Sequence, residues 1–123
     1  MFAINTNCIN IINNIINSNV KNENSFSILK FINVNQLNIS NNIIKAISKN
    51  MNHKYNIYLS RCQDSIITSN NIYNDDFFEN RLTNIFLSIE NYNIIIKNNI
   101  FSSKLKSRYN VYNGYKNNIF SLD

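Results

Sequence analysis

Glycine, proline, tryptophan and histidine are almost absent from this 123-residue chain, which has one Gly, one His, no Pro and no Trp. A phosphate-binding or dinucleotide-binding loop needs several glycines, so neither motif can be present. With one His, two cysteines and no C-x-x-C pair, the chain lacks the ligands of a zinc site. No apolar run approaches the roughly 18 residues of a membrane-spanning helix, and no signal or transit peptide is evident.

Asparagine and isoleucine dominate what is present, with 30 and 23 copies. Their codons are rich in A and T, which indicates an AT-rich gene of an organelle, a protist or a virus. In such a gene, drift replaces polar and basic residues by asparagine. Asparagine-rich chains are often disordered. Here 44% of the residues are hydrophobic and recur periodically, which predicts one folded domain.

The two cysteines, Cys8 and Cys62, are far apart in the sequence. They could form a single disulfide. Free thiols in a reducing compartment are the favoured interpretation, because a lone pair of cysteines is no disulfide framework.

Positive charge gathers at the two ends of the chain, and the net charge is +5. A basic chain favours a polyanionic partner such as RNA, with an ordinary solvated surface as the alternative. Tyr109, Tyr112 and Tyr115 interleave with the C-terminal cations and could stack on unpaired bases. The candidate RNA-binding residues are Arg61, Arg81, Lys97, Lys104, Lys106, Arg108 and Lys116.

Residues for catalysis are scarce. His53 lies in a polar turn, and the acids Asp75, Asp76 and Glu79 fit a solvated turn better than a metal site. Cys62 follows Arg61, which could lower its pKa, but no histidine lies near in sequence to act as a base. We therefore predict no catalytic, cofactor-binding or metal-binding residues and no enzymatic activity.

Apolar periodicity predicts alternating strands and helices. Three- and four-residue spacing indicates helices, whereas alternation and β-formers indicate strands. Asn113-Gly114 predicts a hairpin turn that pairs 109–112 with 115–120. The predicted helices are 8–20, 40–51 and 93–101, and the predicted strands are 26–34, 55–60, 81–89 and 108–112.

From residue 26 onward this order is strand, helix, strand, strand, helix, strand. It predicts an α+β, ferredoxin-like split βαβ fold: an antiparallel sheet with two helices on one face. Residues 1–25 form a helical extension, 26–112 the core with a hairpin arm near 60–78, and 113–123 a tail. We see no internal repeat that would indicate a repeat fold.

The core strand resembles the tenth small-subunit ribosomal protein family, which is ferredoxin-like. The likeness rests on Phe78-Glu79-Asn80-Arg81, followed by Ile85, Leu87 and Ile89. Weaker matches are Ser69-Asn70-Asn71 at the hairpin, Leu37 before the first helix and Leu59-Ser60 after the second strand. A rival likeness, Arg108 to Gly114, is to the nineteenth small-subunit family.

Both resemblances imply a structural protein of the ribosomal small-subunit head. The AT-rich composition adds the expectation that this ribosome is the one of the mitochondrial matrix. Its partners would be rRNA and neighbouring head proteins, with no membrane and no small-molecule substrate. The alternatives are an accessory subunit of an organellar membrane complex and a small viral or protist protein-interaction domain.

Overall fold

The computed structural model describes residues 1–21, 25–49, 53–76, 82–103, 109–115 and 117–122, and all of its regular elements are strands. Among these residues there is no helix, and hence none long and apolar enough to cross a membrane. The first six strands are β1 (Phe2–Ile12), β2 (Ile15–Lys21), β3 (Ser25–Ser40), β4 (Ile43–Lys49), β5 (His53–Ser60) and β6 (Gln63–Thr68). The last six are β7 (Asn71–Asp76), β8 (Leu82–Ile89), β9 (Tyr92–Lys97), β10 (Ile100–Ser103), β11 (Tyr109–Tyr115) and β12 (Asn118–Leu122).

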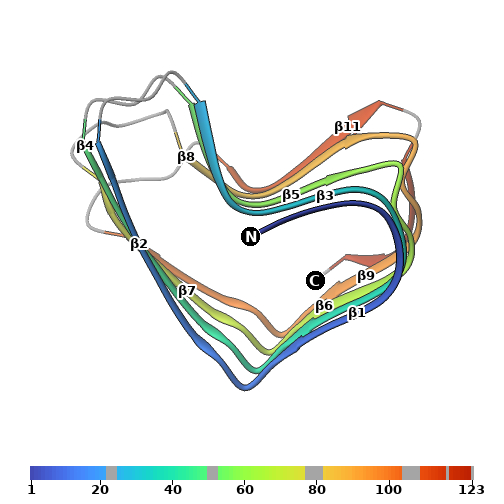
Figure 1. The fold of residues 1–123 in the computed structure, drawn as a ribbon, viewed down its shortest axis with the longest axis horizontal. Coiled ribbons are helices and arrows are strands. Elements are labelled where there is room, and N and C mark those ends of the chain that lie inside the picture. The colour runs from blue at the N-terminus through green and yellow to red at the C-terminus, as the bar shows by residue number, and fades with distance from the viewer. Residues whose placement is uncertain (22–24, 50–52, 77–81, 104–108, 116, 123) are drawn as a thin grey trace.

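Every strand pair among the described residues is parallel, and it joins two strands that are one turn of the chain apart. Ser25 pairs with His53, and Gln63 pairs with Tyr92. The chain is therefore wound into stacked coils of nearly constant length, which is a parallel β-solenoid (Figure 1).

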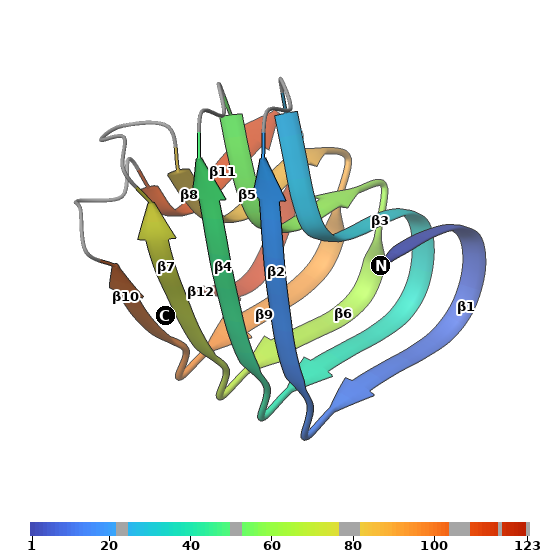
Figure 2. The same cartoon turned by 60° about the vertical axis from the view of Figure 1, so that its left-hand side comes forward.

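Each coil passes through three faces (Figures 1 and 2). The first face holds β5, β8, β11 and the start of β3, and the second holds β6, β9, β12 and the end of β3. β1 pairs along β3 from Lys30 to Ser40 and so bends with it from one face to the next. The third face is the separate sheet β10-β7-β4-β2.

The corners of the coil use left-handed backbone, and they recur in columns. Twelve described residues other than glycine have a positive φ, between 50° and 59°. Half of them are asparagine, the residue that, with glycine and aspartate, best tolerates this conformation. In a chain with one glycine, asparagine thus supplies half of the left-handed corner residues. The columns are Asn5, Asn33, Arg61 and Glu90; Cys8, Gln36, Asp64 and Asn93; and Asn13, Asn41, Ser69 and Asn98.

The core is a stack of inward side chains. Apolar residues at the same coil position lie directly above one another and are almost completely buried. Burying a side chain of this size contributes about 1.5–3 kcal/mol. Three of the columns are Leu29, Ile57 and Ile85; Phe31, Leu59 and Leu87; and Ile39, Ile67 and Ile96.

The predicted α+β, ferredoxin-like fold is wrong, because all three predicted helices are strands. Residues 8–20 contain the end of β1 and most of β2, 40–51 contain β4, and 93–101 contain most of β9 and the start of β10. The isoleucines mimic a helical period because a corner interrupts the two-residue alternation. Isoleucine and asparagine are also poor helix formers, so pairing with neighbouring coils prevails.

The helical extension predicted for 1–25 is likewise absent, since β1 and β2 belong to the same sheets as the other strands. The strands predicted at 26–34, 55–60, 81–89 and 108–112 overlap β3, β5, β8 and β11.

The hairpin predicted at Asn113-Gly114 is also absent. Both residues lie inside β11, which pairs in parallel with β8. Gly114 does not have a positive φ. A Cβ at this position would lie 2.7 Å from the carbonyl oxygen of Leu87 and closer still to that of Ser88. Glycine is therefore required for the close approach of two strands rather than for a turn.

The repeat that the sequence was expected to lack does exist, and its period is one coil. Its clearest trace is the third corner, where two polar residues precede two mostly apolar ones. Because asparagine occurs 30 times, its recurrence at one spacing does not stand out. The four copies are Asn13-Asn14-Ile15-Ile16, Asn41-Asn42-Ile43-Ile44, Ser69-Asn70-Asn71-Ile72 and Asn98-Asn99-Ile100-Phe101.

Candidate binding surface

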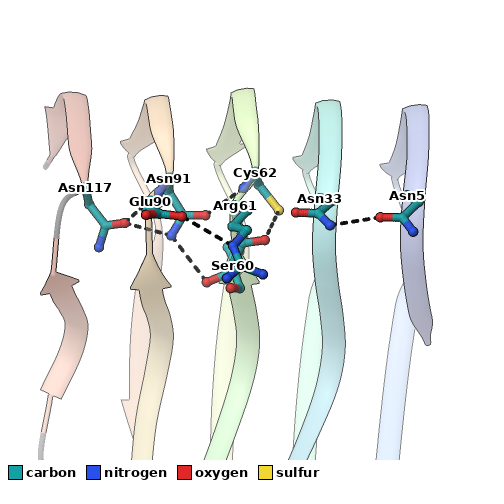
Figure 3. A network of polar contacts seen from close by, with 9 residues as sticks. Asn5, Asn33, Ser60, Arg61, Cys62, Glu90, Asn91 and Asn117 are labelled. Carbon is teal, nitrogen blue, oxygen red and sulfur yellow. Dashed lines mark hydrogen bonds and ion pairs between the residues drawn. The ribbon is translucent and has the colours of Figure 1, made fainter.

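The structure does not bring the predicted RNA-binding residues together. Arg61 lies at the first corner, where its Nε is 3.3 Å from Oε2 of Glu90 (Figure 3). Lys97 is exposed at the far end of the second face, about 20 Å away along the strand direction. The other five, Arg81, Lys104, Lys106, Arg108 and Lys116, lie outside the described residues.

In the part of the chain that the structure describes, no three His, Cys, Asp or Glu side chains gather into a group that could hold a metal ion. Both cysteines are free thiols, with Cys8 exposed and Cys62 buried. Burial raises the pKa of the Cys62 thiol, although hydrogen bonds to the backbone of Val34 and Ser60 oppose the shift. This is the opposite of the lowered pKa considered for Cys62 beside Arg61, so Cys62 is a structural thiol.

The first corner shows how one coil position changes chemistry along the solenoid (Figure 3). Asn33 Nδ2 donates to Asn5 Oδ1 at 2.9 Å, and the next two coils replace this pair by the Arg61–Glu90 ion pair. Both residues of the ion pair are about half exposed. Exposed pairs of this kind contribute less than about 1 kcal/mol. The corner is therefore a structural feature rather than a binding site.

A column of aromatic side chains crosses the outer side of the first face. The register pairs Phe2 with Lys30, Lys30 with Tyr58, Tyr58 with Phe86, and Phe86 with Tyr112. One position thus carries an aromatic ring in four coils and a lysine in the fifth. We call these five residues the aromatic column.

The rings of the aromatic column stack on one another. The Tyr58 and Phe86 centroids are 5.5 Å apart with the ring planes 10° from parallel, and Phe86 and Tyr112 are 4.9 Å apart at 8°. Tyr55 lies beside them, with its centroid 4.5 Å from Phe86 and 5.9 Å from Tyr58. Contacts of this kind contribute about 0.5–1.5 kcal/mol per pair beyond the area that they bury.

Lys30 continues the column towards the N-terminus. Its Nζ lies 5.2 Å from the Tyr58 centroid and 5.6 Å from the Phe2 centroid, which is within the range of cation–π attraction. The cation is therefore sandwiched between two rings.

This stacking limits what the surface can bind. A sugar ring or a nucleobase stacks on the face of an aromatic ring, whereas Tyr58 and Phe86 turn their faces to each other along the axis. The column carries one cation and no acid. An aromatic surface with little charge is typical of the centre of a protein–protein interface.

Sequence reasoning found only one end of this surface. It singled out Tyr109, Tyr112 and Tyr115, which all lie in β11, and it missed Phe2, Lys30, Tyr58 and Phe86. The signal was available in the spacing, because these four residues and Tyr112 recur once in every coil. It becomes visible only once the coil length is known.

No protein-family model, no curated protein and no solved structure matches the chain. The fold also removes one support of the ribosomal resemblance, which rested in part on a ferredoxin-like order of elements.

Proposed function

We propose that the chain is a non-catalytic protein-interaction scaffold that binds a partner protein through the first face. The observation that carries this proposal is the aromatic column, aligned over five coils on a rigid sheet. Rigid aromatic side chains lose little conformational entropy on binding, and they are enriched among the residues that dominate interface energies.

The neighbouring groups support a protein partner. Tyrosine supplies a large apolar area with a hydroxyl that can hydrogen-bond, which suits a surface that is wet when free and dry when bound. Between Phe2 and Tyr112, only Lys30 adds charge to the column. Desolvating this surface therefore costs less than desolvating a charged one.

The third face offers a matched control for the test. Tyr73 on β7 has Lys45 of the preceding coil 5.5 Å from its ring centroid, much as Tyr58 has Lys30. Tyr58 and Tyr73 are both half-buried. Replacing either one by threonine, a good strand former, removes the same kind of contact from a different face.

The experiment is cross-linking and affinity purification of the full chain from cells that express it, followed by quantification of the bound protein. We expect the partner to bind the wild type and Tyr73→Thr, and to be reduced at least tenfold with Tyr58→Thr. Circular dichroism verifies that both variants fold. Equal binding by both variants, or loss with Tyr73→Thr alone, would contradict the proposal.

RNA contact within the ribosomal small subunit is a second proposal, and charge alone supports it. The net charge is +5, and no acid lies between Glu90 and Asp123. Replacing Lys104, Lys106 and Arg108 together by glutamine tests it. For each lost phosphate contact, the slope of log affinity against log salt concentration should decrease in magnitude by roughly 0.7–0.9. If the triple variant co-sedimented with small subunits at the wild-type level and with the same salt dependence, this segment would have no role in RNA contact.

A further inference from the structure

The N-terminal end of the solenoid presents the outer edges of β1 and β2, and the residues of β3 before Lys30 have no β1 partner at this end. β1 pairs with β3 alone and β2 pairs with β4 alone. In the described chain, the outer edges of β1 and β2 therefore carry backbone N–H and C=O groups without a partner strand. Such an edge pairs with another strand unless charge, proline or a covering segment prevents it.

These two edges lack the usual protection. β1 has 11 residues and no charged side chain, and β2 has a single charge at its last residue, Lys21. Lysines occur instead on inner strands, as at Lys30 and Lys45. The N-terminal ammonium is engaged, because it donates to the carbonyl oxygen of Ile28 at 2.7 Å.

The same end also exposes apolar side chains. An open hollow of about 500 Å³ lies there, lined by Asn10, Asn14 and Asn17 and by five apolar residues, Met1, Ile11, Ile15, Ile16 and Leu29. Ile11 and Leu29 are already buried within the chain, whereas Met1 is 62% exposed. Ile15 is 71% exposed. A partner that pairs with the two edges would also cover these side chains.

We propose that the N-terminal end is the interface of a two-fold symmetric dimer, in which a second copy of this chain docks by the same end. The two-fold axis lies across the solenoid axis, so the edge strands of the two copies run antiparallel. Closed two-fold dimers are the commonest oligomers.

The size of the end suits a stable dimer. Taking one coil as the step from Ser25 to its partner His53, at about 3.3 Å per residue, gives a perimeter of about 90 Å. The end that it encloses, with its side chains, covers several hundred Å². Stable interfaces bury about 800 Å² per partner, so a stable dimer requires the whole end and not a single edge strand.

The other two arrangements fit less well. In the described chain the second face stacks five strands and the third face four. Head-to-tail stacking would therefore leave a strand missing from the third face at every junction. Joining two C-terminal ends is disfavoured because the edge strands β10 and β12 have only four and five residues, and very short edge strands are one way in which proteins prevent pairing with another chain.

The test is sedimentation velocity of the full chain. We expect a species of twice the 14.4 kDa chain mass. Ile15→Lys should convert it to the monomer, because the two-fold axis would place two ammonium groups at one apolar interface. Asn10→Lys, an exposed position on β1, should act in the same way from the other edge strand.

Ile100→Lys is the matched control. Ile100 occupies the same coil position as Ile15 at the opposite end and is 64% exposed. It should leave the dimer intact, and circular dichroism should show that all three variants fold. A monomeric wild type would overturn the proposal. Filaments, or dissociation by Ile100→Lys, would overturn it in favour of contacts through the C-terminal end.

Discussion

Asn42 and Asn70 occupy the same position on successive coils, and Asn70 Oδ1 accepts two hydrogen bonds from Asn42. The backbone N–H and the Nδ2 of Asn42 both donate at 3.0 Å. Asn70 Nδ2 in turn donates to the Ile39 carbonyl oxygen and to Asn99 Oδ1, each at 2.9 Å. Asn14 begins this ladder with a bond from its backbone N–H to Asn42 Oδ1 at 2.9 Å. Buried carboxamides thus fix the register of the third corner.

The first prediction changes Asn70 to aspartate, which keeps the shape but replaces the Nδ2 donor by oxygen. That oxygen would face the Ile39 carbonyl and Asn99 Oδ1, so the folded state favours the protonated acid and raises the pKa of the new carboxyl. We expect Asn70→Asp to lose stability progressively as the pH rises above about 4. At neutral pH the cost should be about 3 kcal/mol or more.

Asn71→Asp is the control, because Asn71 is the next residue and is exposed. Urea denaturation at pH 3.5 and pH 7 provides the measurement. If both variants showed the same pH dependence, the buried ladder would not be a determinant of stability.

A second prediction concerns Gly114. In Gly114→Ala the new methyl would collide with the carbonyl oxygens of Leu87 and Ser88, so β11 must move away from β8. We expect hydrogen-exchange protection to fall in β11 and to persist in β5. Asn113→Ala, at the adjacent exposed position, should leave protection in β11 unchanged. If Gly114→Ala kept the wild-type hydrogen-exchange protection in β11, then β11 and β8 would not approach each other as closely as the structure shows.

The Cys62 thiol yields a third prediction. Its raised pKa means that the folded state holds the proton to higher pH than the unfolded state does. Stability should therefore fall as the pH rises above about 8.5. Val34 occupies the equivalent position on the preceding coil, so we choose valine as the replacement. Cys62→Val should reduce the loss of stability at high pH. Cys8→Ser, which removes the exposed thiol, should retain it. If wild type and Cys62→Val lost stability identically with rising pH, the buried Cys62 thiol would not be the cause of the loss.

The sequence predicted individual strands better than their arrangement. The alternation predicted at 55–60 and 81–89 holds from Ile57 to Leu59 in β5 and from Ile85 to Leu87 in β8. It fails at Asn56 and Asn84, which are buried beside Ile57 and Ile85. Strand partners could not be deduced, because parallel pairing between successive coils has no local signal. Asn113-Gly114 shows the limit clearly: a dipeptide typical of hairpins lies within a strand, where it serves a close contact between β11 and β8.

The candidate surface was partly predictable for the same reason. Tyr112 was identified as a possible contact, but its neighbours Phe86 and Tyr58 precede it by one coil and two coils. Of the seven predicted RNA-binding residues, the structure describes only Arg61 and Lys97, and these two lie apart.

A fourth prediction tests the core. Leu87 is fully buried, in the column formed with Phe31 and Leu59. Leu87→Ala should lower the free energy of unfolding by about 2–5 kcal/mol. Ile66→Ala, on the outer side of the second face, should cost much less. Chemical denaturation compares the two variants. Similar costs would mean that the side-chain directions of β6 or β8 are misassigned.

Backbone nuclear Overhauser effects from the isotope-labelled chain provide the most direct test of the solenoid. We expect contacts between residues one coil apart, such as Ile44 with Ile72 and Ala46 with Asn74. We also expect no sequential series of contacts at three-residue spacing over 43–49. The reverse result, three-residue contacts through 43–49 and none between successive coils, would establish a helix there and contradict the parallel solenoid.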